Sequence, residues 1–145
     1  MSLITKYGHG YLFRAAYRQE GQAEFWLVLC TDADAPTEDT EDLSELTEID
    51  EGNGYAAGGI HLDADDVDFA LLDVSGGYTR IGLRTILLEA TGGDIPASGD
   101  PIKYAVLRDA DNKVHVAWTF ASTQTVPSGQ QRQITDLLAR LSPPA

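Results

Sequence analysis

The sequence predicts a mostly β protein, an antiparallel β-sandwich of the jelly-roll or immunoglobulin-like kind with one or two short helices. Roughly six to eight short apolar stretches recur about every ten residues, and Gly-rich turns separate them. Several stretches alternate apolar with polar residues, which is typical of an antiparallel strand with one buried face. The 145 residues fit a single domain, 1–145, whose one core is large enough to support the fold.

The chain is predicted to begin with a short helical or extended segment at about residues 1–20. Within it, 11–18 fits a short helix, because its small apolar residues fall on one face. The aromatic residues of the same stretch also suit a strand, so both alternatives stay open. The next apolar run, 25–31, is rich in aromatic and branched residues and predicts a buried strand.

An acidic loop is predicted at about residues 32–51. Its first part contains Pro36 and almost no apolar residue, which indicates an exposed loop. Thr40 then precedes two acids and an apolar pair three residues apart, the pattern of an N-cap and a first helical turn. We therefore expect a short helix at 41–47 with Thr40 as its N-cap.

The stretch 48–59 forms the hinge between this acidic half and the β-rich remainder. Glycine reaches positive φ without steric cost, so the glycines here indicate a tight turn and close backbone contacts. The one large ring among small neighbours, Tyr55, is expected to cover the backbone segment that approaches. The residues of this structural hinge are Gly52, Gly54, Tyr55, Gly58 and Gly59.

The remainder of the chain predicts a series of strands. They lie at 60–63, 69–74, 78–88, 102–107 and 114–120. The last two are joined by a hairpin turn at 109–112, because Asp and Asn tolerate left-handed conformations and bond their own backbone. Residues 133–141 fit a helix face and a strand, and the pattern alone leaves both open.

Negative charge is the strongest compositional feature. The formal net charge is −13, which disfavours nucleic acid and anionic membrane as partners because phosphate binding relies on Lys and Arg. No Lys or Arg lies between Arg18 and Arg80, and the part of this gap from Asp32 to Asp73 holds fifteen of the twenty-three acids. This stretch is either a solvated surface or a surface that docks on a basic partner or a cation.

The sequence carries no sign of a secreted or membrane-spanning protein. The N-terminus lacks the continuous apolar region of a signal peptide, and no apolar run reaches the roughly 20 residues of a membrane span. Cys30 is the only cysteine, which excludes an internal disulfide and a cysteine-based zinc site. Its apolar neighbours predict a buried, inert thiol.

No motif of the sequence indicates catalysis or a cofactor. The phosphate loop, the dinucleotide-binding glycine pattern and the nucleophile elbow are all missing. The three histidines, His9, His61 and His115, lack metal-ligand spacing and are expected on exposed strands or loops. The candidate cation ligands are Asp63, Asp65, Asp66 and Asp68, although Val67 stands where an EF-hand loop needs an oxygen ligand. We expect no enzyme, no catalytic residue and no cofactor.

Six short motifs are distributed over most of the chain. They are Leu-x-Thr at 29–31, Ala-Pro-Thr at 35–37, LSELTEI at 43–49, GNGYAAGG at 52–59, GGDIPASG at 92–99 and IKYAVL at 102–107. Together they resemble a family of small virion proteins of tailed bacteriophages, and the resemblance is densest at the hinge. In that family the region corresponding to 133–141 is a strand, which we adopt as the expectation.

The resemblance implies a non-enzymatic structural protein of the virion, assembled in the host cytoplasm. The first expectation is a cement or decoration protein on the capsid, bound to the major capsid protein or other virion proteins. Such a protein is expected to form homo-oligomers, for example trimers. The alternative is a tail-associated module, in a fibre, tail tip or neck, that is structural or binds host glycans.

Overall fold

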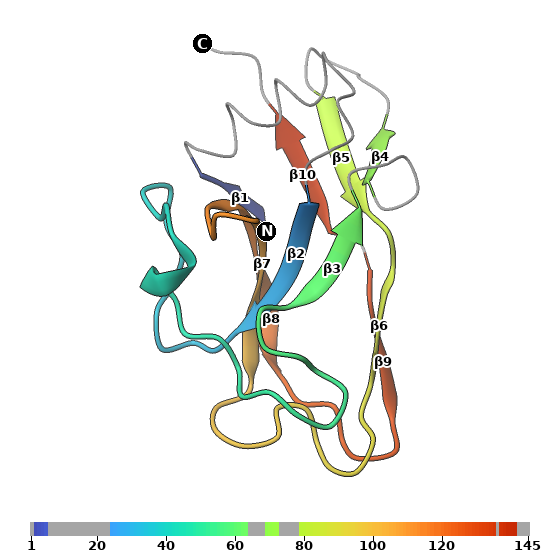
Figure 1. The fold of residues 1–145 in the computed structure, drawn as a ribbon. Helices are drawn as coiled ribbons and strands as arrows, with labels where there is room; N and C mark the ends of the chain where they lie inside the picture. Colours follow the sequence, from blue (N-terminus) through green and yellow to red (C-terminus); the bar gives the residue numbers. More distant parts are fainter. Residues whose placement is uncertain (1, 6–23, 64–68, 73–78, 136, 142–145) are drawn as a thin grey trace.

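The computed structural model describes residues 2–5, 24–63, 69–72, 79–135 and 137–141. These residues form antiparallel strands in packed layers (Figure 1), which confirms the predicted mostly β, sandwich-like fold. The helix considered at 11–18 lies outside the described residues. Within the described ranges, the helical structure is one short 3-10 turn, η1 (Leu43–Glu45).

The larger sheet has five strands in the order β1, β8, β7, β2, β3, and every neighbouring pair is antiparallel. The inner strands β2 (Glu24–Cys30) and β7 (Ile102–Asp109) contain two of the predicted apolar runs. Because these runs are apolar at successive positions, most residues of the two central strands are buried on both faces of the sheet. The other strands are β1 (Ser2–Ile4), β3 (Ile60–Asp63) and β8 (Val114–Gln124).

The second layer is built from five short strands. They are β4 (Phe69–Leu72), β5 (Thr79–Leu83), β6 (Ile86–Glu89), β9 (Gln131–Ile134) and β10 (Leu138–Leu141). β5 pairs with β4 and β10, and β6 pairs with β9. Gly82 lies opposite Leu138 and Ile86 lies opposite Ile134, so the register is the same in both pairs. β5–β6 and β9–β10 therefore form one antiparallel ladder that is interrupted at the same place on both sides.

This interruption corrects the prediction of one continuous strand at 78–88. Arg84 and Thr85 are exposed and lie between β5 and β6. On the partner side, 133–134 belong to β9 and 138–141 form β10, so this stretch is strand rather than helix at these positions, as expected.

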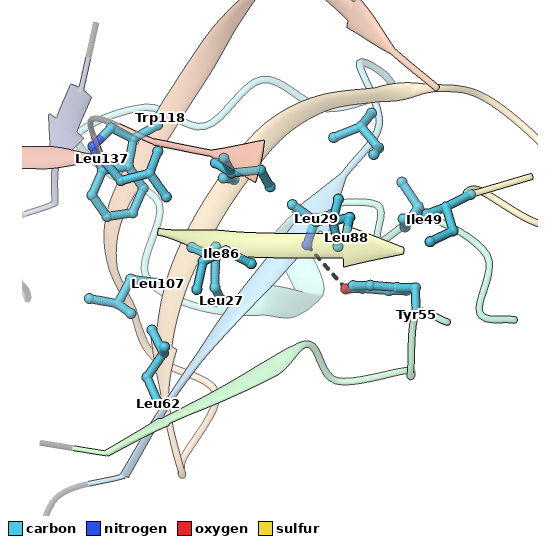
Figure 2. Packing of buried hydrophobic residues seen from close by; sticks show 14 of the residues in the cluster. Leu27, Leu29, Ile49, Tyr55, Leu62, Ile86, Leu88, Leu107, Trp118 and Leu137 are labelled. Atoms are coloured by element: carbon cyan, nitrogen blue, oxygen red, sulfur yellow. Dashed lines mark hydrogen bonds between the residues drawn. The ribbon is translucent and has the colours of Figure 1, made fainter. Parts of the chain in front are cut away.

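The main hydrophobic core lies between the layers (Figure 2). Leu27 and Leu29 of β2 have no exposed surface, and they belong to one packed cluster with Ile86 of β6. Trp118 of β8 also enters this core, and its indole N–H donates a 3.0 Å hydrogen bond to the carbonyl of Leu138 in β10. Apolar burial thus drives the association of the layers, and the Trp118 bond fixes one against the other.

A smaller cluster covers the opposite face of the larger sheet. Val28 and Cys30 of β2 are fully buried there. The acidic loop supplies part of the cover, because Leu46 belongs to this cluster and Leu43 packs against it. The loop predicted at 32–51 is therefore a packed part of the fold, anchored by the apolar residues of its helical turn.

The helix expected at 41–47 is a single 3-10 turn, and its N-cap is Asp42 rather than Thr40. The Asp42 carboxylate accepts a 2.9 Å hydrogen bond from the Ser44 N–H, and the Glu45 carboxylate accepts a 2.8 Å bond from the Asp42 N–H. This reciprocal capping box satisfies the exposed donors at the start of the turn. The residue after the turn is already extended, which ends the helix.

Candidate functional site

Tyr55, the ring at the centre of the hinge, is buried in the main core. Its hydroxyl donates a 2.7 Å hydrogen bond to the Glu48 carboxylate. The hydroxyl also accepts a 3.1 Å bond from the Leu29 N–H, which Figure 2 shows as a dashed line. The same oxygen of Glu48 accepts a 2.8 Å bond from the Gly58 N–H. Tyr55 therefore joins the hinge to β2 and to the end of the acidic loop. Burial raises the pKa of its hydroxyl, which stays protonated.

Two hinge glycines lie where another backbone segment leaves no room for a side chain. A Cβ on Gly59 would lie 2.6 Å from the carbonyl oxygen of Leu27, and a Cβ on Gly54 would lie 2.3 Å from that of Glu89. Both glycines also have positive φ, at 99° and 117°, where other residues are strained. These contacts place the hinge directly against β2 and β6.

Gly52 begins a tight turn that connects the hinge to a second loop. Its N–H donates to the Tyr55 carbonyl at 2.8 Å, and the Tyr55 N–H donates back to the Gly52 carbonyl at 3.1 Å. Asn53, inside the turn, donates from its side-chain amide to the Asp94 carbonyl at 2.8 Å. The Asn53 carbonyl accepts a 2.9 Å bond from the Thr91 N–H. The hinge turn and the loop at 91–95 thus form one connected end of the sandwich.

A row of three side chains crosses β7, β2 and β3, and one of them is His61, which is exposed on its strand as expected. Arg108 lies opposite Trp26, which lies opposite His61 in the register of the sheet. The Arg108 guanidinium is 4.3 Å from the centre of the Trp26 ring, and its Nε and Nη2 donate to the Gly58 carbonyl at 3.1 and 2.8 Å. Arg108 therefore connects the hinge to the sheet. The three side chains meet because of the strand register, since they are far apart in the sequence.

His115 contradicts the expectation of an exposed histidine. It has no exposed surface, and its Nε2 lies 2.9 Å from the Asp109 carboxylate. The other oxygen of that carboxylate accepts hydrogen bonds from the N–H groups of Asp111 and Lys113, at 2.9 and 3.0 Å. Asp109 therefore organises the predicted hairpin turn and contacts the buried imidazole at the same time.

Of the candidate cation ligands, Asp63 is described, whereas Asp65, Asp66 and Asp68 lie outside the described residues. Asp63 is exposed on β3, 3.8 Å from one ring nitrogen of His61, whose other nitrogen lies 3.4 Å from Glu24. Within the described ranges, no group of three or more His, Cys, Asp or Glu side chains is placed to hold a metal ion.

Cys30 lies fully buried at the end of β2, in the smaller cluster. Burial, with a lesser contribution from the negative charge of Glu48, raises the pKa of its thiol to about 12. A nucleophilic cysteine needs a lowered pKa and solvent access, so this protonated thiol is a packing residue.

The acidic loop exposes its carboxylates on a backbone that is held in place. We call its exposed acids the acidic surface: Asp32, Asp34, Glu38, Asp39, Glu41, Glu45, Asp50 and Glu51. At one end the Thr31 N–H donates to the Thr47 carbonyl at 2.8 Å, and in the middle the Val114 N–H donates to the Glu41 carbonyl at 3.0 Å. In the described part of this loop, Asp42 forms an ion pair with Lys113 at 3.4 Å.

Comparisons with models of protein families, with curated proteins and with solved structures found no match to this chain. No helix in the described part of the chain is long and apolar enough to cross a membrane. What the geometry offers is a firmly connected β scaffold that presents a fixed, acidic surface.

Proposed function

We propose that the protein is a non-enzymatic structural protein of a tailed-bacteriophage virion, a cement or decoration protein that stabilises the head shell. The support from the sequence is the set of motifs that resembles small virion proteins, above all the motif at 52–59. The support from the structure is a β scaffold whose connecting loops are held by hydrogen bonds to the strands. The proposed partner is the major capsid protein.

One observation carries this proposal: the acidic surface is fixed in shape before any partner binds. The capping box sets the conformation of η1, and Leu43 and Leu46 anchor the turn on the sheet. A preorganised surface loses little conformational entropy on binding. Carboxylates on such a surface suit a basic seam between capsid subunits, because complementary charge orients the encounter and speeds association.

The symmetry of a shell adds an expectation about assembly. A protein that binds at a local symmetry axis meets identical partner surfaces, which favours a closed homo-oligomer such as a trimer. The oligomer would then present several acidic surfaces to the shell together, and the linked contacts would strengthen binding beyond that of one copy.

The test is co-sedimentation of the purified protein with expanded empty capsids of its phage, at low and high salt. We expect the wild type to sediment with the shell, and less so as salt screens the charges. The double variant Glu38→Lys and Asp39→Lys should stay in the supernatant. The control double variant, Glu89→Lys and Asp100→Lys, makes the same charge change at exposed sites outside the acidic surface. No sedimentation of the wild type, or equal behaviour of the two double variants, refutes the proposal.

A tail-associated role, structural or glycan-binding, is the second candidate, and Trp26 favours it. This ring is only partly buried, and it lies beside Arg108 and 5.2 Å from the ring of His61. An accessible aromatic ring beside polar side chains is a common feature of ligand sites. Quantitative mass spectrometry of purified virions separates the two roles: many copies per particle indicate the shell, and few copies indicate the tail.

A further inference from the structure

A groove opens between the end of β8 and β9. It is open to solvent and has a volume of about 220 Å³, enough for several water molecules. Its lining includes the apolar side chains of Leu88, Ile102, Phe120 and Ile134 and the polar side chains of Gln124 and Arg132. The groove therefore has room for an apolar side chain next to the positive charge of Arg132.

Arg132 projects from the side of its sheet that packs on the core, at the rim of the groove, where its own side chain is exposed. It is the cross-strand partner of Leu88, and partners in a ladder project to the same side. Leu88 is 3% exposed, so this side is the one that packs on the core. Arg132 donates one hydrogen bond to the Gln124 side chain, whereas a guanidinium carries five N–H donors. No described carboxylate forms an ion pair with it.

The backbone beside the groove is a strand edge. β9 pairs with β6 on one side, and no described strand pairs with its other side. The outer N–H and C=O groups of such a strand can form hydrogen bonds with an added extended chain, which is a common mode of peptide recognition.

We propose that the β9 edge binds an extended segment of a different polypeptide, whose apolar side chain enters the groove and whose carboxylate pairs with Arg132. Alternate residues of a strand point to one side, so the two recognised side chains stand two positions apart in the ligand. An arginine suits this task because its planar fork binds a carboxylate through two parallel bonds. The inference rests on the proposed function in assuming a protein partner, and it names the chemistry of that partner.

The same arginine disfavours a second copy of β9 as the occupant. A strand that brings no anion would cover the guanidinium and leave it without a counter-charge, which is costly. Inward-pointing charges on edge strands are a known protection against self-pairing. The edge is thus selective: it rejects neutral or basic strands and accepts an acidic one.

The experiment is an NMR titration of the ¹⁵N-labelled full chain with two capped peptides, Thr-Val-Thr-Glu-Thr and Thr-Val-Thr-Lys-Thr. We expect the Glu peptide to shift the amide signals of 131–134 and of Phe120, and to bind at least about tenfold more tightly than the Lys peptide. Arg132→Glu should reverse this preference. Arg84→Glu, with the same charge change at an exposed site outside the groove, should keep it.

Equal binding of the two peptides to the wild type, or shifts that avoid the groove, would overturn the proposal. If Arg132→Glu does not give a folded spectrum, Arg132→Gln replaces it, and that variant should bind the two peptides equally. The titration uses no capsids, so its failure leaves the co-sedimentation result standing, and failure of co-sedimentation leaves the peptide result standing.

Discussion

The hydroxyl of Tyr55 donates to the carboxylate of Glu48 at 2.7 Å, so a side chain of the hydrophobic core holds the end of the acidic loop. The hydroxyl also accepts the Leu29 N–H, and the carboxylate also accepts the Gly58 N–H. The Tyr55 hydroxyl and the N–H groups of Leu29 and Gly58 therefore all have partners, as buried polar groups require. Tyr55 both fills the core and sets the position of the acidic surface.

Removing the Tyr55 hydroxyl should cost more stability than its size suggests. Tyr55→Phe leaves the Leu29 N–H without its acceptor, so we expect the free energy of unfolding to fall by about 1–3 kcal/mol. Tyr55→Ala opens a cavity as well and should lower it by about 3–5 kcal/mol. Urea denaturation followed by tryptophan fluorescence measures both changes.

The matched control for this prediction is Tyr104→Phe. Tyr104 is also buried, but no hydrogen bond of its hydroxyl to a described residue is present. Loss of the Tyr104 hydroxyl should change the free energy of unfolding by less than about 0.5 kcal/mol. Equal effects of the two Tyr→Phe changes would show that the Tyr55 network contributes nothing.

Local patterns predicted the elements whose burial follows directly from residue order. β2 and the β7–β8 hairpin were expected because apolar runs and alternation are visible without knowledge of the partners. The turn between β7 and β8 was equally visible, and Asn112 takes the positive φ of 61° that Asx residues tolerate. The hinge glycines were recognised because glycine also tolerates positive φ. The sequence did not show which carbonyl groups approach Gly54 and Gly59.

What the sequence could not provide depends on pairing between distant segments. One strand can be drawn through Arg84 and Thr85 with Ile81, Leu83 and Leu87 on the same side, so periodicity gave no sign that the ladder is interrupted there. The Arg108–Trp26 contact and the Arg132 groove depend on strand register in the same way. The N-cap error was avoidable, because Glu45 stands three residues after Asp42 and this spacing is a capping-box pattern.

Gly59 should tolerate no side chain. Gly59→Ala combines a strained positive φ with a contact of 2.6 Å to the Leu27 carbonyl oxygen, so we expect a loss of about 2–4 kcal/mol in unfolding free energy. Gly129→Ala is the control, because Gly129 has a φ of 78° but no atom within 4 Å of the added Cβ. That change should cost only the conformational strain, about 1–2 kcal/mol. Thermal unfolding of the two variants should therefore differ, and coinciding curves would refute the predicted clash.

Lys103 should stabilise an irregular part of the β7–β8 pairing. Ile102 pairs with Gln124 and Tyr104 with Thr119, so Lys103 alone lies opposite the four residues 120–123. Its ammonium donates to the Phe120 carbonyl at 2.9 Å. Lys103→Met should lower the unfolding free energy by about 1 kcal/mol and speed hydrogen exchange at 120–123, because the carbonyl loses its donor. Lys103→Arg keeps N–H donors at this position and should be nearly as stable as the wild type. Unchanged hydrogen exchange at 120–123 in Lys103→Met would contradict a stabilising role of Lys103.

Cys30 makes stability fall with rising pH on the alkaline side. The pKa of its thiol is raised to about 12 in the folded protein from an ordinary value of 9.0. Between these values the unfolded chain releases a proton that the folded chain keeps, so the unfolding free energy declines by at most about 1.4 kcal/mol per pH unit. Cys30→Ala removes this contribution.

The raised pKa of Tyr55 also lowers the unfolding free energy as pH rises, but only above the ordinary tyrosine value of 10.0, so the two effects are separable. The unfolding free energies of wild type and Cys30→Ala, measured by denaturation at a series of pH values, should differ by a constant amount below pH 9.0. Above pH 9.0 the difference should shrink or change sign. A difference that stays constant up to pH 10.0 would disprove the proton linkage.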